Sequence, residues 1–122
     1  MNELVERLTK PQKVTIGTRL EDRLDDLRGQ AERGYVFVKF TETRGGTELG
    51  VRVEPDASDL AAAQKGQGTI TVVGKLILNY VRVRCHATVE LPSLDGTGYL
   101  EVIEEVTPAQ LAEERAKRGS ES

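Results

Sequence analysis

Aromatic residues are scarce in this sequence, which has three Tyr, two Phe and no Trp among its 122 residues. A platform that stacks the bases of single-stranded nucleic acid needs exposed rings, so this composition argues against one. An excess of basic residues is also missing: the formal net charge is −3, whereas proteins that bind duplexes neutralise phosphates with Lys and Arg. A nucleic-acid-binding module that uses Lys39, Lys75, Arg82 and Arg84 is therefore less favoured than the two other functions considered below, protein binding and small-molecule binding.

The sequence also has one Cys and one His, which are adjacent at positions 85 and 86. One Cys cannot form an internal disulfide, so a reducing, cytoplasmic setting is the simpler expectation. Zinc requires three or four ligands drawn from Cys, His and carboxylates, so we expect no metal site, and no motif points to a cofactor. No segment approaches the roughly 20 apolar residues that span a bilayer, and we expect a soluble chain without a membrane partner.

What the sequence does contain is a series of short elements within one expected domain, 1–122, whose last residues, 119–122, are expected to fray. Helical spacing or strict alternation of apolar residues predicts helices 2–9, 19–33, 59–65 and 108–118 and strands 13–17, 35–42, 47–54, 69–78, 80–91 and 99–106. Strands follow one another instead of alternating with helices. We therefore expect an α+β fold, a mainly antiparallel sheet of five or six strands with helix 19–33 packed on one face and short terminal helices.

The strongest local pattern is that of helix 19–33. Thr18 and Glu21 match a capping box, in which each side chain accepts a hydrogen bond from the other residue's free backbone N–H. Gly34 is placed for a left-handed C-terminal cap. The apolar residues at helical spacing are Leu20, Leu24, Leu27 and Ala31. This stripe is expected to pack against the sheet.

Other local signals mark caps and turns. Ser58 is predicted to cap helix 59–65, and Thr107 with Gln110 forms a second capping box before helix 108–118. Gly74 interrupts an alternating strand, which predicts a bulge or bend. Asn79 is the predicted turn before strand 80–91.

Alternation in strand 80–91 separates its two most reactive side chains. Cys85 falls on the apolar side, which predicts a buried and unreactive thiol. His86 falls on the opposite side of a regular strand. The two residues are therefore not expected to form a Cys–His nucleophile pair or to share a metal.

Arg82, Arg84 and His86 form a polar row on the outward side of this strand. Glu101 and Glu105 of the last strand are placed to pair with the row, and a register with Arg84 beside Glu105 keeps the apolar faces aligned. Cross-strand pairing is favoured because charged rows on strands are usually solvated. In the alternative, the row contacts an anion or another ligand.

The favoured function comes from apolar residues on the sheet face opposite the core. Tyr35 and Phe37 of one strand and Tyr99 and Ile103 of another occupy that face, where a one-sided sheet would show polar residues. We expect another chain to cover them, which favours a non-enzymatic protein-binding or assembly module, most simply a homodimer. In the alternative, a terminal helix of the same chain covers them.

The remaining alternative is a small-molecule binder or cofactor-less enzyme. Its pocket would lie between the sheet and helix 19–33 and would use His86 or Tyr99 as its polar group. No catalytic residue is predicted. The RGGT segment at 44–47 lacks the spacing and the following helix of a phosphate loop, and nothing apolar surrounds the acidic residues of helix 19–33 to raise a carboxyl pKa.

Overall fold

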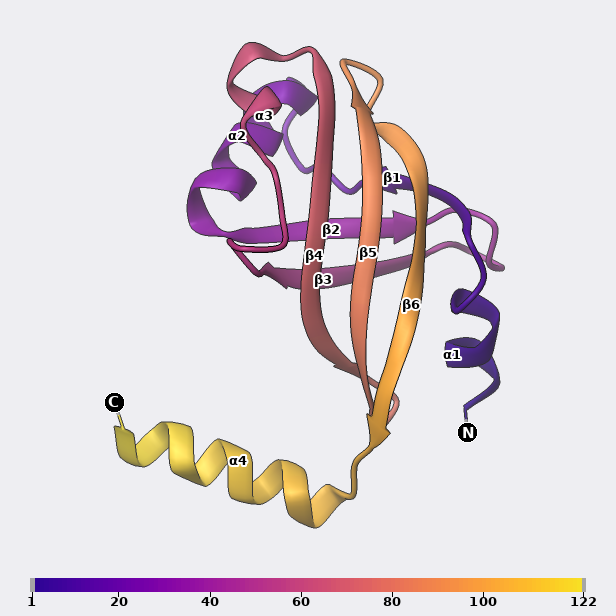
Figure 1. Ribbon diagram of the computed structural model, residues 1–122, viewed down its shortest axis with the longest axis vertical. Helices are drawn as coiled ribbons and strands as arrows, with labels where there is room; N and C mark the ends of the chain where they lie inside the picture. The colour runs from indigo at the N-terminus through magenta and orange to yellow at the C-terminus, as the bar shows by residue number, and fades with distance from the viewer. Residues whose placement is uncertain (1, 122) are drawn as a thin grey trace.

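The computed structural model describes the backbone of residues 2–121 and the side chains of residues 2–116 (Figure 1). The strands are β1 (Gln12–Ile16), β2 (Tyr35–Phe40), β3 (Thr47–Val53), β4 (Gly68–Leu78), β5 (Val81–Leu91) and β6 (Asp95–Glu105). The helices are α1 (Glu3–Leu8), α2 (Arg23–Arg33), α3 (Ala62–Lys65) and α4 (Pro108–Glu121). The predicted fraying of 119–122 lies outside the residues whose side chains are described.

Each strand pairs antiparallel with the next one along the chain, and β6 pairs with β1, so the sheet closes into a barrel. The α+β class and the antiparallel sheet are thereby confirmed. Figure 1 shows β1–β3 running across β4–β6 as two halves of one closed sheet. Closure was not predicted, and it turns the second face of the expected sheet into the outside of a barrel.

The join between β3 and β4 is the narrowest contact between neighbouring strands. The two strands pair only at Arg52 with Lys75 and at Val53 with Gly74. A Cβ on Gly74 would lie 2.1 Å from the carbonyl oxygen of Arg52, so only glycine allows this approach. Gly74 therefore marks the place where β4 comes close to β3. It is not a break in the pairing with β5, because the β4–β5 register continues unbroken through Gly74.

The core fills the inside of the barrel and is completed by the helices. Alternate residues of the strands point inward, as the alternation predicted. Figure 1 shows α1 on one side of the barrel and α2 with α3 on the opposite side. The fully buried contributions from outside the strands are Val5, Leu8, Leu27, Ala63 and Leu94.

Helix α2 starts later than predicted, which corrects both its cap and its packing face. Its N-cap is Asp22, whose side chain accepts a hydrogen bond from the Asp25 N–H, so the Thr18–Glu21 capping box is wrong. Leu20 lies before the helix and is 55% exposed, whereas Leu27 is buried. Gly34 does form the predicted left-handed C-terminal cap, with φ of 69°.

The physical reason for the late start is the side chain of Asp26. Its carboxylate accepts hydrogen bonds from the backbone N–H groups of Arg19 and Leu20, the latter at 3.0 Å. These donors fold the segment before the helix back onto α2, so it cannot continue the helix. The same backbone donors lower the pKa of Asp26, because they stabilise its charged form.

Gln30 joins α2 to the barrel and is almost completely buried. Its side-chain amide donates to the Gly17 carbonyl oxygen at 2.8 Å and to Asp26 Oδ1 at 3.2 Å. Its carbonyl oxygen accepts from the Phe37 N–H at 2.9 Å. One side chain thus connects the end of β1, helix α2 and strand β2.

The other predicted turns and caps give mixed results. Thr107 and Gln110 form the predicted capping box, with hydrogen bonds of 2.7 and 3.1 Å. Asn79 lies in a two-residue turn with positive φ, as expected. The prediction for Ser58 is wrong: helix α3 has Ala61 at its N-cap, and the Ser58 hydroxyl instead exchanges hydrogen bonds with the Val73 backbone because it lies beside β4.

Truncating Leu27 to Ala should destabilise the fold by about 2–5 kcal/mol, because it empties a fully buried site at the α2–barrel contact. The matched substitution Leu20→Ala, seven residues earlier, should change stability by no more than about 0.5 kcal/mol, since Leu20 is exposed. Urea denaturation of both variants measures the difference. Equal effects would contradict the start of α2 at Arg23.

Replacing Gln30 with Ala should lower the free energy of unfolding by about 1–3 kcal/mol, because buried backbone groups lose their partners. Hydrogen exchange at the Phe37 amide should accelerate by more than the loss of global stability alone would cause. Gln64→Ala, on the exposed side of α3, is the control. Unchanged exchange at Phe37 would show that the Gln30 contact does not hold α2 to β2.

Candidate functional site

Strand β5 shows the predicted separation of its two faces. Cys85 points into the core and is fully buried, and burial raises the pKa of its thiol to about 12. His86 lies on the outside of the barrel, half-buried. The core position of Cys85 is confirmed, and the two side chains lie on opposite sides of the sheet.

Each member of the outward row on β5 contacts a carboxylate. Arg82 pairs with Glu104 at 3.1 Å and with Glu114 of α4. Arg84 pairs with Glu54 at 3.1 Å and is 3.8 Å from Glu101. The contacts with Glu104 and Glu101 of β6 are cross-strand pairs, as favoured, whereas Glu114 belongs to α4 and Glu54 follows β3.

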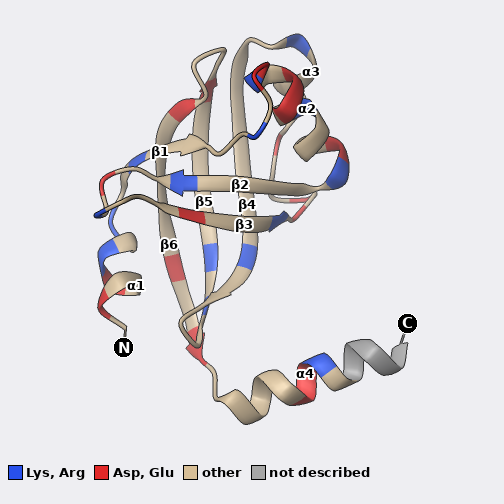
Figure 2. Cartoon of the chain, turned by 180° about the vertical axis from the view of Figure 1, so that it is seen from behind, with Lys and Arg blue, Asp and Glu red and all other residues tan. Residues whose placement is uncertain are grey.

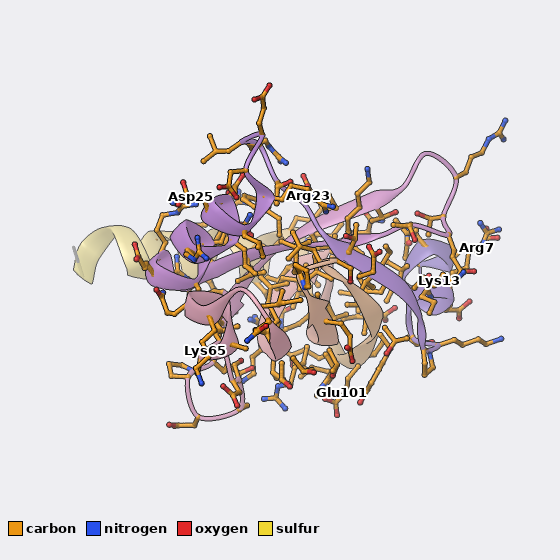
Figure 3. The ribbon with its side chains drawn as sticks, turned by 90° about the horizontal axis from the view of Figure 1, so that it is seen from above. Arg7, Lys13, Arg23, Asp25, Lys65 and Glu101 are labelled. Atoms are coloured by element: carbon orange, nitrogen blue, oxygen red, sulfur yellow. The ribbon has the colours of Figure 1, made fainter. Side chains whose placement is uncertain are left out.

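His86 completes this row through Glu101, which projects from the outer surface of β6 (Figure 3). Its Nε2 lies 3.0 Å from Glu101 Oε1, and this hydrogen bond lowers the pKa of Glu101. The imidazole also stacks on the Tyr99 ring, with 4.8 Å between centroids. His86 is therefore part of a packed surface contact.

The predicted pairing of Arg84 with Glu105 is wrong. Arg84 lies opposite Glu101, and Glu105 lies opposite Val81. Strand β6 begins at Asp95, earlier than predicted, because the turn between β5 and β6 is short and Leu94 is inserted in the core. The shorter turn shifts the register of the hairpin.

The four predicted interface residues lie in two places on the barrel. Tyr35 and Phe37 of β2 form an edge-to-face pair with centroids 5.4 Å apart. Tyr99 and Ile103 lie on β6, and β1 runs between β2 and β6. The structure therefore brings Tyr35 and Phe37 together but does not join them with Tyr99 and Ile103 in one flat face.

A groove opens where β3 and β4 diverge beyond their two-residue contact. It is open to solvent, has a volume of about 1600 Å³ and lies between β3, the C-terminal half of β4 and α4. Its apolar and aromatic lining includes Tyr35, Leu49, Val53, Leu76, Ile77, Tyr80 and Leu111. No helix or strand pattern in the sequence indicated it, because the groove depends on how far two strands separate.

Helix α4 forms the far wall of this groove. It leads away from the barrel after β6 (Figures 1 and 2). The Arg82–Glu114 ion pair connects it to β5, and Leu111 is half-buried on the groove side. Tyr80, at the turn between β4 and β5, is 54% exposed in the same lining.

The predicted pocket between the sheet and helix 19–33 has no counterpart in this groove, whose lining contains no residue of α2. A smaller cavity of about 430 Å³, beside Asn2, Tyr80 and Thr107, also lies away from α2. Among the described residues, no group of three or more His, Cys, Asp or Glu could hold a metal ion. Within the same residues, no helix is long and apolar enough to cross a membrane.

No model of a known protein family matches the chain, and no curated protein matches its sequence.

A thiol reagent should leave native Cys85 unmodified, because the side chain is enclosed and its thiol is protonated at neutral pH. Thr88→Cys, at an exposed position of the same strand, should add one rapidly labelled thiol. The absorbance of the thiolate released by the reagent, measured with and without denaturant, gives the number of accessible and buried thiols in each protein. Rapid labelling of the unsubstituted protein would contradict the inward placement of Cys85.

Proposed function

We propose that the chain is a small, non-enzymatic protein-binding module of the cytoplasm that assembles with a second copy of itself. The docking surface in this proposal is the groove between β3, β4 and α4. The observation that carries the proposal is a helix that leads away from its barrel beside an open groove with an apolar and aromatic lining.

Helix α4 has few contacts of its own to stabilise it. It is 14 residues long, and isolated helices of that length are marginal in water. Among its described side chains, only Leu111 and Glu114 are half-buried. Contact with a second copy would bury more of the helix and supply the missing stabilisation.

The groove lining also supports association. Tyr80, Leu76 and Ile77 leave apolar surface in water, and burying such surface is worth about 25 cal/mol per Å². Tyrosines near the centre of an interface are frequent energetic anchors. In a two-fold dimer, each copy would present the same groove and the same α4 to the other.

The proposed surface retains part of the interface predicted from the sequence. Tyr35 lines the groove, and Phe37 packs against Tyr35 from the next outward position of β2. Tyr99 and Ile103 lie on β6 and outside this groove lining. The proposed contact is therefore centred on β3, β4 and α4.

Light scattering at micromolar concentration should give the mass of a dimer, and Leu111→Glu should reduce it to that of a monomer without lowering the melting temperature of the barrel. A charge at Leu111 would meet the apolar lining of the groove. Ala112→Glu, at an exposed position of α4, should leave the dimer intact.

A monomeric unsubstituted chain would contradict the proposal. If Leu111→Glu then lowered the melting temperature, the role of α4 would be to pack against the barrel of its own chain.

A further inference from the structure

Three basic residues lie side by side across the outside of β3, β4 and β5. Arg52 is directly opposite Lys75, and Lys75 is directly opposite Arg84. Figure 2 shows basic positions on these neighbouring strands. Directly opposed residues have their Cβ atoms about 5 Å apart, and like charges in that relation repel. The row therefore costs stability unless negative charge lies near it.

Only one end of the row has that negative charge. Arg84 is compensated by Glu54 and Glu101. Within the described part of the chain, neither Arg52 nor Lys75 has a carboxylate within ion-pair distance. The two arginines of the neighbouring strand β5, Arg82 and Arg84, both have acidic partners.

The carboxylates of the groove are mostly engaged elsewhere. Glu48 accepts two hydrogen bonds from Arg19, at 3.1 and 2.6 Å, which lower its pKa. Glu54 is bound to Arg84, and Glu114 to Arg82. Asp56 remains as an acidic group in the lining, against the cations of Arg52, Lys75 and Arg115. The lining as a whole has four cations and four carboxylates, so its positive charge is a local feature of Arg52 and Lys75.

Arg52 is also held in place before any ligand arrives. Its guanidinium carbon lies 5.9 Å from the centre of the Tyr35 ring. That ring lies over Gly50, where a Cβ would be 2.1 Å from the tyrosine oxygen, so the glycine makes room for it. Arg52, Tyr35 and Lys75 all belong to the groove lining. A guanidinium fixed by an aromatic ring loses less freedom when it binds an anion.

We propose that Arg52 and Lys75 bind a phosphate group of a small organic ligand. The Arg52 fork can donate two hydrogen bonds to phosphate oxygens, while Lys75 contributes a compact positive charge from the adjacent strand. The apolar side of the groove, at Leu76 and Ile77, is available for the rest of the ligand. This site goes beyond self-association, because a single copy supplies all of its residues.

Calorimetric titration with inorganic pyrophosphate at constant ionic strength tests the site. The unsubstituted protein should bind it, and the double variant Arg52→Gln, Lys75→Gln should bind at least about tenfold more weakly through loss of charge-assisted hydrogen bonds. Lys65→Gln is the control: Lys65 is an exposed cation on α3 (Figure 3), outside the groove lining, and its loss should leave affinity unchanged.

A second measurement does not depend on binding. Without ligand and at low salt, the double variant should melt at or above the temperature of the unsubstituted protein, because it loses two like-charge contacts. Absence of pyrophosphate binding, or equal binding by the double variant, would overturn the proposal. A response to succinate but not to pyrophosphate would overturn the assignment to phosphate.

The mass of each sample separates this result from the proposed self-association. Pyrophosphate binding by a monomer would support the site and contradict the dimer. Because the proposed dimer contact would cover the same groove, a dimer that does not bind pyrophosphate is compared with the monomeric Leu111→Glu variant, and absence of binding by that monomer would overturn the site alone.

Discussion

The close approach of β3 and β4 at Gly74 is the constraint on which the rest of this structure depends. Without a side chain at Gly74, β4 can reach the Arg52 carbonyl and complete the barrel. The contact lasts for only two residue pairs, so the strands separate directly beyond it and leave the groove. The same contact sets Arg52 opposite Lys75. Barrel closure, the groove and the uncompensated charges thus have one geometric origin.

The opposite side of the barrel is held by polar groups that would be costly if left unpaired. The segment from Gly17 to Asp22, which follows β1, has no regular secondary structure, so its backbone groups need other hydrogen-bond partners. Gln30 and Asp26 provide them from one side of α2. These hydrogen bonds keep α2 in position, which lets Leu27 close the core. Packing and polar pairing depend on each other there.

The sequence predicted those features whose cause is local. Alternation identified the strands and the inward position of Cys85, and the turn at Asn79 and the Thr107–Gln110 cap follow from residues a few positions apart. The predictions failed where a distant or tertiary partner decides. Asp26 binds the backbone before α2, so the helix starts later with Asp22 as its cap, and the inserted Leu94 shifts the partner of Arg84. Closure depends on a contact between strands that no periodicity encodes.

The candidate site could not be read from the sequence for a related reason. Arg52 and Lys75 each occupy an outward position of a strand, where a charged residue is ordinary. Their environment becomes unusual only through the register, and through Arg19 and Arg84, which engage the nearest carboxylates of β3 and of the segment after it. The net charge of the chain does not reveal these two adjacent cations. With a net charge of −3, the surrounding surface disfavours polyanions, so two adjacent cations within a groove suit a small phosphate better than a nucleic acid.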